Sequence, residues 1–424
     1  MFSSLRATLA DRFRALRHRN FRLFWIGQLV SVIGTWMQSV GQGWLMHRLT
    51  GSAWMLGLLG FTQFIPVTLF SLWAGVVADR VDKRRMILIT QSLAAVQALL
   101  LAAVVSGGMV KPWMVLVLAF VFGTINAFDL PARQSFLVEM VGKEDLPNAI
   151  ALNSAAFNTA RVIGPAIAGI VVALAGEQWC FWLNALSYLA VIAMLLRMDL
   201  VARPAAAAAG AAAASLMEGV RYVLATPPVR NLLLLLGIMC CLGFQYTTLL
   251  PVYARQILRT GSEAYGLMVS AFGLGSLLSA IVLTRRHDRW RLRRNLQLAL
   301  ASAAIGMAVF AWSRVLPLTL AMGFAAGFGL ILYVASTNVL LQLSIEDRFR
   351  GRVMSLYTFM FIGTAPVGAL TVGAIAQRFG APVATSLSAC VLIGGAIWVS
   401  YRLRVLAARE ALAATPPLHA EKLG

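Results

Sequence analysis

Charged residues are scarce in this chain. Asp, Glu, Lys and Arg make up 12% of its 424 residues, against about a quarter in soluble domains. Hydrophobic residues make up 60%. A chain with this balance has too few polar side chains to cover a folded surface in water, so the composition excludes a soluble enzyme and a disordered chain.

Cysteine and histidine are also rare, with four of each. The cysteines lie in or beside apolar stretches and show no Cys-x-x-Cys or zinc-type spacing. The histidines lie outside the apolar stretches, so we expect neither a metal site nor a histidine proton relay within a membrane. The chain also lacks the Gly-x-x-x-x-Gly-Lys-Ser/Thr loop that binds ATP, and we expect no cofactor.

Acidic residues are outnumbered by basic ones, 16 against 36, which gives a net charge of +20. The basic residues gather in short runs between long apolar stretches. A basic soluble surface would indicate nucleic acid, whereas this pattern is typical of the loops of a membrane protein. We therefore expect membrane lipids as partners and no nucleic acid.

Twelve apolar stretches have about the 20 residues that a helix needs to cross a bilayer. The first six lie near 22–46, 53–78, 86–106, 112–138, 147–175 and 179–197. The second six lie near 231–256, 264–284, 295–313, 316–343, 352–376 and 382–402. The sequence therefore predicts an all-α integral membrane protein with twelve transmembrane helices.

The loops differ sharply in charge. Both chain ends and the loops after even-numbered spans, including 129–147, hold 29 of the 36 Lys and Arg, and the opposite loops hold six. Because basic loops stay on the cytoplasmic side, we expect a multi-pass protein of the inner (plasma) membrane with both termini in the cytoplasm.

The longest segment between spans lies midway along the chain. It divides the protein into a cytoplasmic basic amphipathic segment, an N-terminal six-helix bundle, a central cytoplasmic linker, a C-terminal six-helix bundle and a cytoplasmic tail, at 1–21, 22–197, 198–229, 230–403 and 404–424. Gly/Pro-containing stretches around Pro165 and Pro366 echo each other 201 residues apart. Two pseudo-symmetric bundles of this kind are typical of secondary transporters, with the substrate bound between them.

The link between the second and third spans reads Gly75-Val-Val-Ala-Asp79-Arg80-Val-Asp82-Lys83-Arg84-Arg85. A glycine allows close helix approach, and a carboxylate at a membrane edge requires a basic partner or a helix N-terminus. The plainer interpretation is a stop-transfer charge cluster. The stretch resembles the loop 2–3 signature of the major facilitator superfamily, with Asp82 in place of its second glycine. The resemblance implies a cytoplasmic gate that contains Gly75, Asp79, Arg80, Lys83 and Arg84 and meets the region of Arg350 to Arg352.

The fifth span carries Arg161-Val-Ile-Gly164-Pro165-Ala-Ile-Ala-Gly169, which is similar to the Gly-Pro-x-x-Gly signature of exporters in that superfamily. The similarity implies a hinge at Gly164, Pro165 and Gly169. Stretches starting at Gly34, Leu49, Phe128 and Ala151 are similar to the enterobactin-exporter-like group, also called transmembrane secretion effectors. The arginine signature that the superfamily carries in its fourth span is missing here.

Polar side chains recur at helical spacing within several spans. In the first span, Gln28, Ser31, Thr35, Gln38 and Gln42 share one face. Such a face is costly in lipid, so it lines either a water-filled cavity or a contact between helices. We assign to a central substrate cavity Gln38, Gln42, Asn126, Asn158, Arg161, Gln245 and Asn338.

Two charged residues stand out. Arg161 is the one basic residue deep within a predicted span, and we expect it to face the interior with a partner. It serves either the substrate or a structural ion pair. Asp129 is the only carboxylate placed within a span, which makes it the candidate for proton coupling unless it lies at the inner edge.

These features predict a secondary active transporter rather than an enzyme. It would export a small molecule, such as a siderophore, drug or metabolite, by alternating access and with proton coupling; we favour a monomer. One alternative is a non-transporting receptor or assembly subunit. A membrane-embedded enzyme is a further alternative, but it would need acid–base or metal-ligating clusters that the spans lack.

Overall fold

The computed structural model describes residues 13–199, 212–283 and 289–414. All regular structure in these ranges is helical, which confirms the predicted all-α fold. Part of the basic N-terminal segment, part of the central linker, the loop at 284–288 and the end of the tail lie outside the described residues.

The first half begins with a 3₁₀ turn and continues with five α-helices. They are η1 (Arg14–Arg17), α2 (Arg19–Thr50), α3 (Ala53–Arg80), α4 (Lys83–Ser106), α5 (Pro112–Ala175) and α6 (Gln178–Leu196). The helix α7 (Ala212–Ala225) lies within the predicted central linker.

The second half contains longer irregular stretches. Its helices are α8 (Pro227–Ile238), α9 (Leu250–Val252), α10 (Ser262–Leu283), α11 (Arg289–Trp312), α12 (Leu316–Ser344), α13 (Arg350–Thr358), α14 (Ala365–Phe379) and α15 (Ala381–Ala414). Between them lie π-helical turns at Met239–Gly243, Tyr253–Ile257 and Phe359–Gly363, and 3₁₀ turns at Gln245–Leu249 and Asp347–Phe349. Single π-turns within helices often mark functional positions.

Eleven helical segments of the described chain are long and apolar enough to cross a membrane. One of them, α5, has 64 residues and would be about 96 Å long if straight, roughly three times the hydrocarbon thickness. Gly142, with φ 73° and ψ −178°, interrupts the helix. The two arms of α5 on either side of Gly142 are separate spans. If each arm is counted as one span, the eleven segments become the twelve predicted helices.

Residues 129–147, which we count with the basic inner loops although the fourth predicted span runs to 138, are helical on both sides of Gly142. The first arm of α5 continues past Pro131 to Gly142, and the second arm begins directly after it. Only glycine adopts such a positive φ without strain, so the chain turns at Gly142 without a connecting loop. Asp129 and Arg133 therefore lie on the same helical arm.

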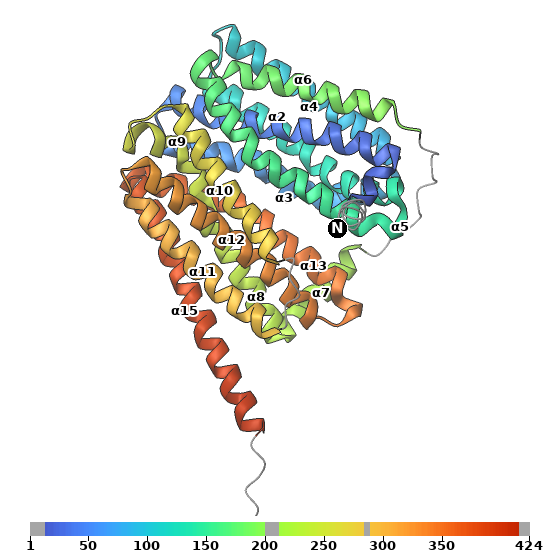
Figure 1. Cartoon of the computed structure of the whole chain (residues 1–424), viewed down its shortest axis with the longest axis vertical. Coiled ribbons are helices and arrows are strands. Elements are labelled where there is room, and N and C mark those ends of the chain that lie inside the picture. Colours follow the sequence, from blue (N-terminus) through green and yellow to red (C-terminus); the bar gives the residue numbers. More distant parts are fainter. Residues whose placement is uncertain (1–12, 200–211, 284–288, 415–424) are drawn as a thin grey trace, which may run out of the picture.

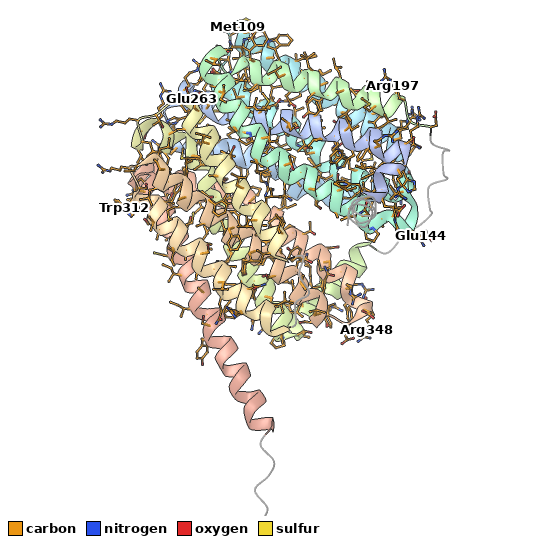
Figure 2. All side chains as sticks on the ribbon, viewed as in Figure 1. Met109, Glu144, Arg197, Glu263, Trp312 and Arg348 are labelled. Atoms are coloured by element: carbon orange, nitrogen blue, oxygen red, sulfur yellow. The ribbon has the colours of Figure 1, made fainter. Side chains whose placement is uncertain are left out.

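The helices form two groups that lie side by side (Figure 1). The blue to green helices, α2 to α6, form the first bundle, and the yellow to red helices, α8 to α15, form the second. Met109, Glu263 and Trp312 lie at one end of the molecule, which we name the far end, and Glu144, Arg197 and Arg348 lie at the other, which we name the basic end (Figure 2).

Glycines set the distance between α2 and α6. A Cβ added at Gly27 would lie 3.2 Å from Cα of Val191, and one added at Gly34 would lie 2.4 Å from Oγ of Ser187. At Gly41 the added Cβ would lie 3.1 Å from Cβ of Cys180. These glycines recur every seven residues on one face of α2, so α6 packs directly against its backbone.

Candidate functional site

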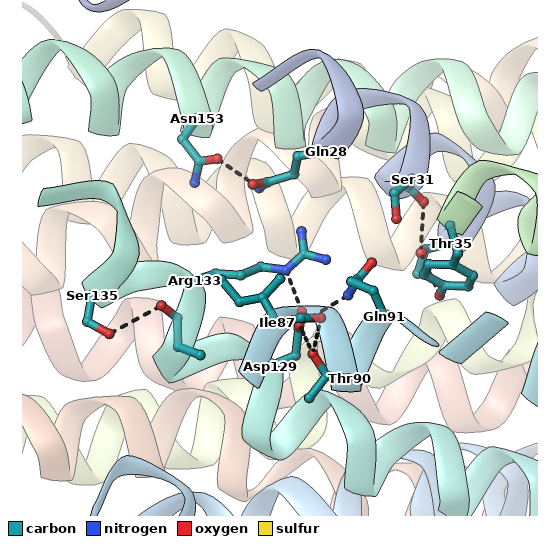
Figure 3. A network of polar contacts seen from close by, with 12 residues as sticks. Gln28, Ser31, Thr35, Ile87, Thr90, Gln91, Asp129, Arg133, Ser135 and Asn153 are labelled. Atoms are coloured by element: carbon teal, nitrogen blue, oxygen red, sulfur yellow. Dashed lines mark hydrogen bonds and ion pairs between the residues drawn. The ribbon is translucent and has the colours of Figure 1, made fainter. Parts of the chain in front are cut away.

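Asp129 is the centre of a buried polar network in the first bundle (Figure 3). Its side chain forms an ion pair with Arg133, one helical turn later on α5. From α4, Oγ1 of Thr90 donates to Oδ1 of Asp129 at 2.6 Å, and Nε2 of Gln91 donates to the same oxygen at 3.1 Å. These donors compensate the burial of the Asp129 side chain in a helix that crosses the membrane.

The network changes the interpretation of this region. From the sequence we expect Arg133 in a basic inner loop and Arg161 as the one basic residue deep in a span. The Arg133 side chain is only 15% exposed and lies on the helical arm that contains Asp129. Protonation of Asp129 would therefore remove the charge that neutralises Arg133.

The polar face of α2 lies mainly against other helices. Nε2 of Gln38 donates to Oε1 of Gln97 at 3.1 Å, and Oε1 of Gln38 accepts from Nδ2 of Asn184 at 2.8 Å. Gln38 is 1% exposed, and both ends of its amide are bonded to neighbouring helices. Nearer the basic end, Nε2 of Gln28 donates to Oδ1 of Asn153 at 2.8 Å. Gln38, which we expect in a substrate cavity from the sequence, lies in this structure at a contact between α2, α4 and α6.

The remaining amide candidates are spread over both bundles. Gln42 is buried, and its Nε2 has no hydrogen-bond partner. Nδ2 of Asn158 donates to the carbonyl oxygen of Ser154 at 2.9 Å, while Asn126 is half-buried. In the second bundle, Nε2 of Gln245 donates to the carbonyl oxygen of Cys240 at 3.3 Å, and Oδ1 of Asn338 accepts from Gln342 at 2.5 Å.

Arg161 differs from the other arginines of the spanning helices. It lies on the second arm of α5, about 21 Å along the helix from Ala175. Its Nε is buried and has no hydrogen-bond partner, and its Cζ lies 5.4 Å from the centre of the Trp36 ring. The sequence leads us to expect a charged partner for Arg161. Among the described residues, its neighbour is the ring of Trp36, and no carboxylate forms an ion pair with it. A charge at this depth costs at least about 2.5–3.5 kcal/mol on insertion scales.

The motif after Arg161 packs tightly against two helices. A Cβ added at Gly164 would lie 2.7 Å from Cβ of Trp36 on α2, so this glycine brings α5 close to α2. Toward α10, an added Cβ on Gly266 would lie 2.3 Å from the carbonyl oxygen of Pro165 and 2.9 Å from Cα of Gly169. The backbone of α5 stays helical through this motif, and its one interruption among the described residues is at Gly142.

The predicted gate motif spans the junction of α3 and α4. Nζ of Lys83 contacts Oε1 of Glu139 at 2.7 Å, and the Arg84 guanidinium donates to the carbonyl oxygens at the end of α6, Leu195 and Leu196. Arg80 is exposed, and the side chain of Asp79 lies outside the described part of the structure. Oδ1 of Asp82 accepts from the backbone N–H of Arg85 at 2.7 Å, which caps the start of α4.

Gly75 does not have the close neighbour that the sequence analysis expects. A Cβ added there would meet no atom of the described residues within 4 Å. On the second bundle, Arg352 forms an ion pair with Glu218 of α7 at 2.9 Å, and Arg350 forms one with Asp347 at 2.6 Å. The described contacts of Lys83 and Arg84 thus hold the first bundle together at its basic end.

The two bundles meet along two seams that start at the far end. Between α5 and α10, Oγ of Ser262 donates to the carbonyl oxygen of Gly169 at 3.0 Å. Between α3 and α14, Oγ of Ser52 donates to Oε1 of Gln377 at 2.9 Å, and a Cβ added at Gly57 would lie 2.9 Å from Cα of Gly373. These contacts join helices that are far apart in the sequence.

His47 is a residue that the sequence analysis missed. The predicted first span ends at residue 46, but α2 continues to Thr50, and His47 is only 2% exposed. Its Nε2 lies 3.5 Å from Nε2 of Gln256 in the second bundle. His47 therefore lies in the last turn of α2, beyond the predicted end of the first span. The inclusion of His47 in this helix is hard to predict from the sequence because Arg48 follows it and ends the apolar run.

The sequence has clear relatives. The profile of the transmembrane secretion effector family matches residues 10–423. The Staphyloferrin A transporter of Staphylococcus aureus is 26% identical over 85% of this chain and 90% of its own length. The multidrug efflux pump Tap of Mycolicibacterium fortuitum is 27% identical over 83% of this chain and 88% of its own length.

Solved structures show the same fold. A bacterial homologue of the human lysosomal transporter Spinster, in an inward-facing and occupied conformation, superposes with a TM-score of 0.72. The match covers 91% of this chain and 96% of that one, at 12% sequence identity. The likeness confirms the predicted fold of two helical bundles.

Proposed function

Because the chain belongs to the transmembrane secretion effector family of the major facilitator superfamily, we propose that it exports a small molecule by alternating access. The members of this family that are similar to it are transporters and not enzymes. The cargo would be a siderophore, drug or metabolite, since relatives are named for a siderophore and for drugs. The distribution of basic residues favours an inner-membrane protein with cytoplasmic termini, so the far end would face outward.

The arrangement of the two bundles is the observation that carries this proposal. They touch along seams of backbone and small residues, such as Gly57 on Gly373 and Gly266 on Gly169, which can separate without breaking many side-chain contacts. Rocking of one bundle against the other would open a site between them to each side in turn. Asn126, Asn158, Arg161, Gln245 and Asn338 remain our candidates for this site, with Gln42 near its outer end.

The gate and the hinge remain proposals of the same kind. The segment from Gly75 to Arg84 would close the cytoplasmic side, with Asp79 opposite the start of α13. The open space beside Gly75 would be filled by a helix of the second bundle when that side closes. Gly164, Pro165 and Gly169 would act as the surface on which α10 slides.

Proton coupling would use the Asp129–Arg133 pair. In the ionised state the two charges neutralise each other within the first bundle. Proton binding to Asp129 would leave Arg133 as a buried, unpaired cation, which favours a conformation that exposes Arg133 to water or to an anion. The free energy of the proton gradient would in this way bias one conformation over the other.

Transport into everted membrane vesicles tests the proposal. Vesicles come from a host that lacks its own siderophore and drug exporters, and the probes are staphyloferrin A and ethidium. We expect the full-length protein to accumulate at least one probe when the lumen is acidic, and a protonophore to abolish this accumulation. Asp129→Asn should reduce proton-driven accumulation to background because it removes the titrating group.

Two controls separate coupling from folding. Asp129→Asn leaves Arg133 unpaired, so Asp129→Asn/Arg133→Gln restores neutrality and should also lack proton-driven transport while reaching wild-type abundance in the membrane. Gly394→Ala, at an open surface position, should transport normally. Vesicles that accumulate neither probe would refute the exporter and favour a receptor or assembly subunit, while full activity in the double variant would remove Asp129 from the coupling mechanism.

A further inference from the structure

Arg161 carries a positive charge that no acidic side chain in the described chain neutralises. Among the described residues, the buried carboxylates are Asp129 on α5 and Glu177 directly before α6, and each is paired with another arginine, Arg133 and Arg48 respectively. The face of Trp36 attracts the Arg161 guanidinium, but an aromatic ring supplies neither a full negative charge nor an acceptor for Nε. The site therefore lacks one anion.

The position of Arg161 places this missing charge between the bundles. Its backbone faces α10, since a Cβ added at Gly273 would lie 2.9 Å from the carbonyl oxygen of Arg161. Its side chain reaches the ring of Trp36 on α2. Helices of both bundles thus surround the residue, at about the middle of its helical arm.

Based on these contacts, we propose that the transported molecule is an anion whose carboxylate or other oxyanion group binds the guanidinium of Arg161 beside Trp36. The proposal rests on the exporter function, because it takes this site as the substrate site. A guanidinium binds a carboxylate through two parallel N–H···O bonds, and the Trp36 ring lies beside this guanidinium, 5.4 Å from its Cζ. An anion supplies the missing charge, whereas a cation would add a second positive charge at the same place.

Matched pairs of probes isolate the charge of the ligand. Benzoate and benzamide share a ring, and succinate and succinamide share a chain, so each pair differs mainly in charge. Binding to the detergent-purified full-length protein is measured by calorimetric titration at constant salt concentration. We expect the anion of each pair to bind at least about tenfold more tightly than its amide, the size expected for a charge-assisted hydrogen bond.

Variants assign the preference to this site. Arg161→Gln should bind anion and amide equally, and Arg161→Lys should keep a weaker preference because a lysine lacks the planar fork. Arg348→Gln is the matched control, since it removes an exposed arginine that is 73% accessible and should leave the preference unchanged. If Arg161→Gln does not fold, Trp36→Phe tests the same contact, because its weaker ring should reduce the affinity for benzoate.

The outcomes are distinct from those of the transport assay. Equal binding of anion and amide by the wild type, an unchanged preference in Arg161→Gln, or a preference that Arg348→Gln removes would each overturn the anion site. Export could still proceed in those cases, and only this inference would fail. An Arg161-dependent preference without any transport would instead support the anion site and refute the exporter.

Discussion

Buried polar residues in this protein have two different roles, which their partners reveal. Gln38, Gln97 and Asn184 bond to one another across three helices of one bundle. Nε of Arg161 has no hydrogen-bond partner among the described residues, and the residue lies where the bundles meet. An amide that is bonded to neighbouring helices stabilises the fold, whereas a group that lacks a partner is available to a ligand.

Gln38→Ala should reduce stability and leave the chemistry of transport intact. The substitution removes the partner of Gln97 Oε1 and of Asn184 Nδ2, and each buried group left unpaired costs about 1–3 kcal/mol. The midpoint of thermal unfolding in detergent should fall, while transport per folded molecule stays near the wild-type rate. Gln342→Ala removes an exposed amide and should leave the midpoint unchanged. A normal midpoint with lost transport would return Gln38 to the substrate site.

The elements of the first bundle are held at fixed distances by glycines. Gly27, Gly34 and Gly41 form a stripe on α2 that admits the backbone and short side chains of α6. Since membrane helices gain little from the hydrophobic effect when they associate, close backbone packing supplies much of their attraction. The bundle therefore depends on the absence of side chains at these positions.

Gly34→Ala should separate α2 from α6. Its Cβ would lie 2.4 Å from Oγ of Ser187 and 2.6 Å from Oδ1 of Asn184, both of which belong to the Gln38 network. Overpacking of this kind costs about 1–3 kcal/mol. Size-exclusion chromatography after heating should show earlier loss of the monodisperse peak. Gly394→Ala, which meets no atom within 4 Å, is the control, and equal heat resistance of the two variants would contradict the close packing at Gly34.

Sequence periodicity and charge are sufficient to predict most of the elements, because a spanning helix needs a long apolar run and basic residues interrupt those runs. They fail at 129–147, where polar residues suggest a loop but the chain remains helical up to Gly142. They also cannot show that Gln38 bonds to Gln97 and Asn184, because a polar stripe reads the same against water and against another helix. The sequence shows that Arg161 is a charged residue within a span, but it does not show that Trp36 lies beside it.

For the whole molecule, the seams between the bundles decide which motions are possible. Both seams begin at the far end, one formed by α5 and α10 and the other by α3 and α14. A transporter that opens to the outside must separate these helices at that end. The contact of Ser52 with Gln377 should therefore form and break once in each cycle.

Cross-linking Ser52→Cys to Gln377→Cys should arrest export. The two side chains lie 2.9 Å apart, Oγ to Oε1, so a short thiol-reactive cross-linker can join cysteines placed there. The background carries Ser in place of Cys390, which is exposed, and of Cys241, which is half-buried. Accumulation in everted vesicles should fall to background after cross-linking and recover when a cleavable linker is reduced. Each single-cysteine variant treated in the same way should stay active, and unimpaired transport by the cross-linked protein would show that the far end does not open.

The absence of a loop at Gly142 has a mechanical consequence. Asp129 lies 13 residues before this glycine and Arg161 lies 19 residues after it. Both charged residues therefore belong to the same helix, α5, which is interrupted only at Gly142. A tilt of the arm that carries Asp129 would be passed on to the arm that carries Arg161 through this one glycine, since no loop lies between the two arms. Proton uptake at Asp129 and cargo release at Arg161 would then be coupled by the joint movement of the two arms of α5.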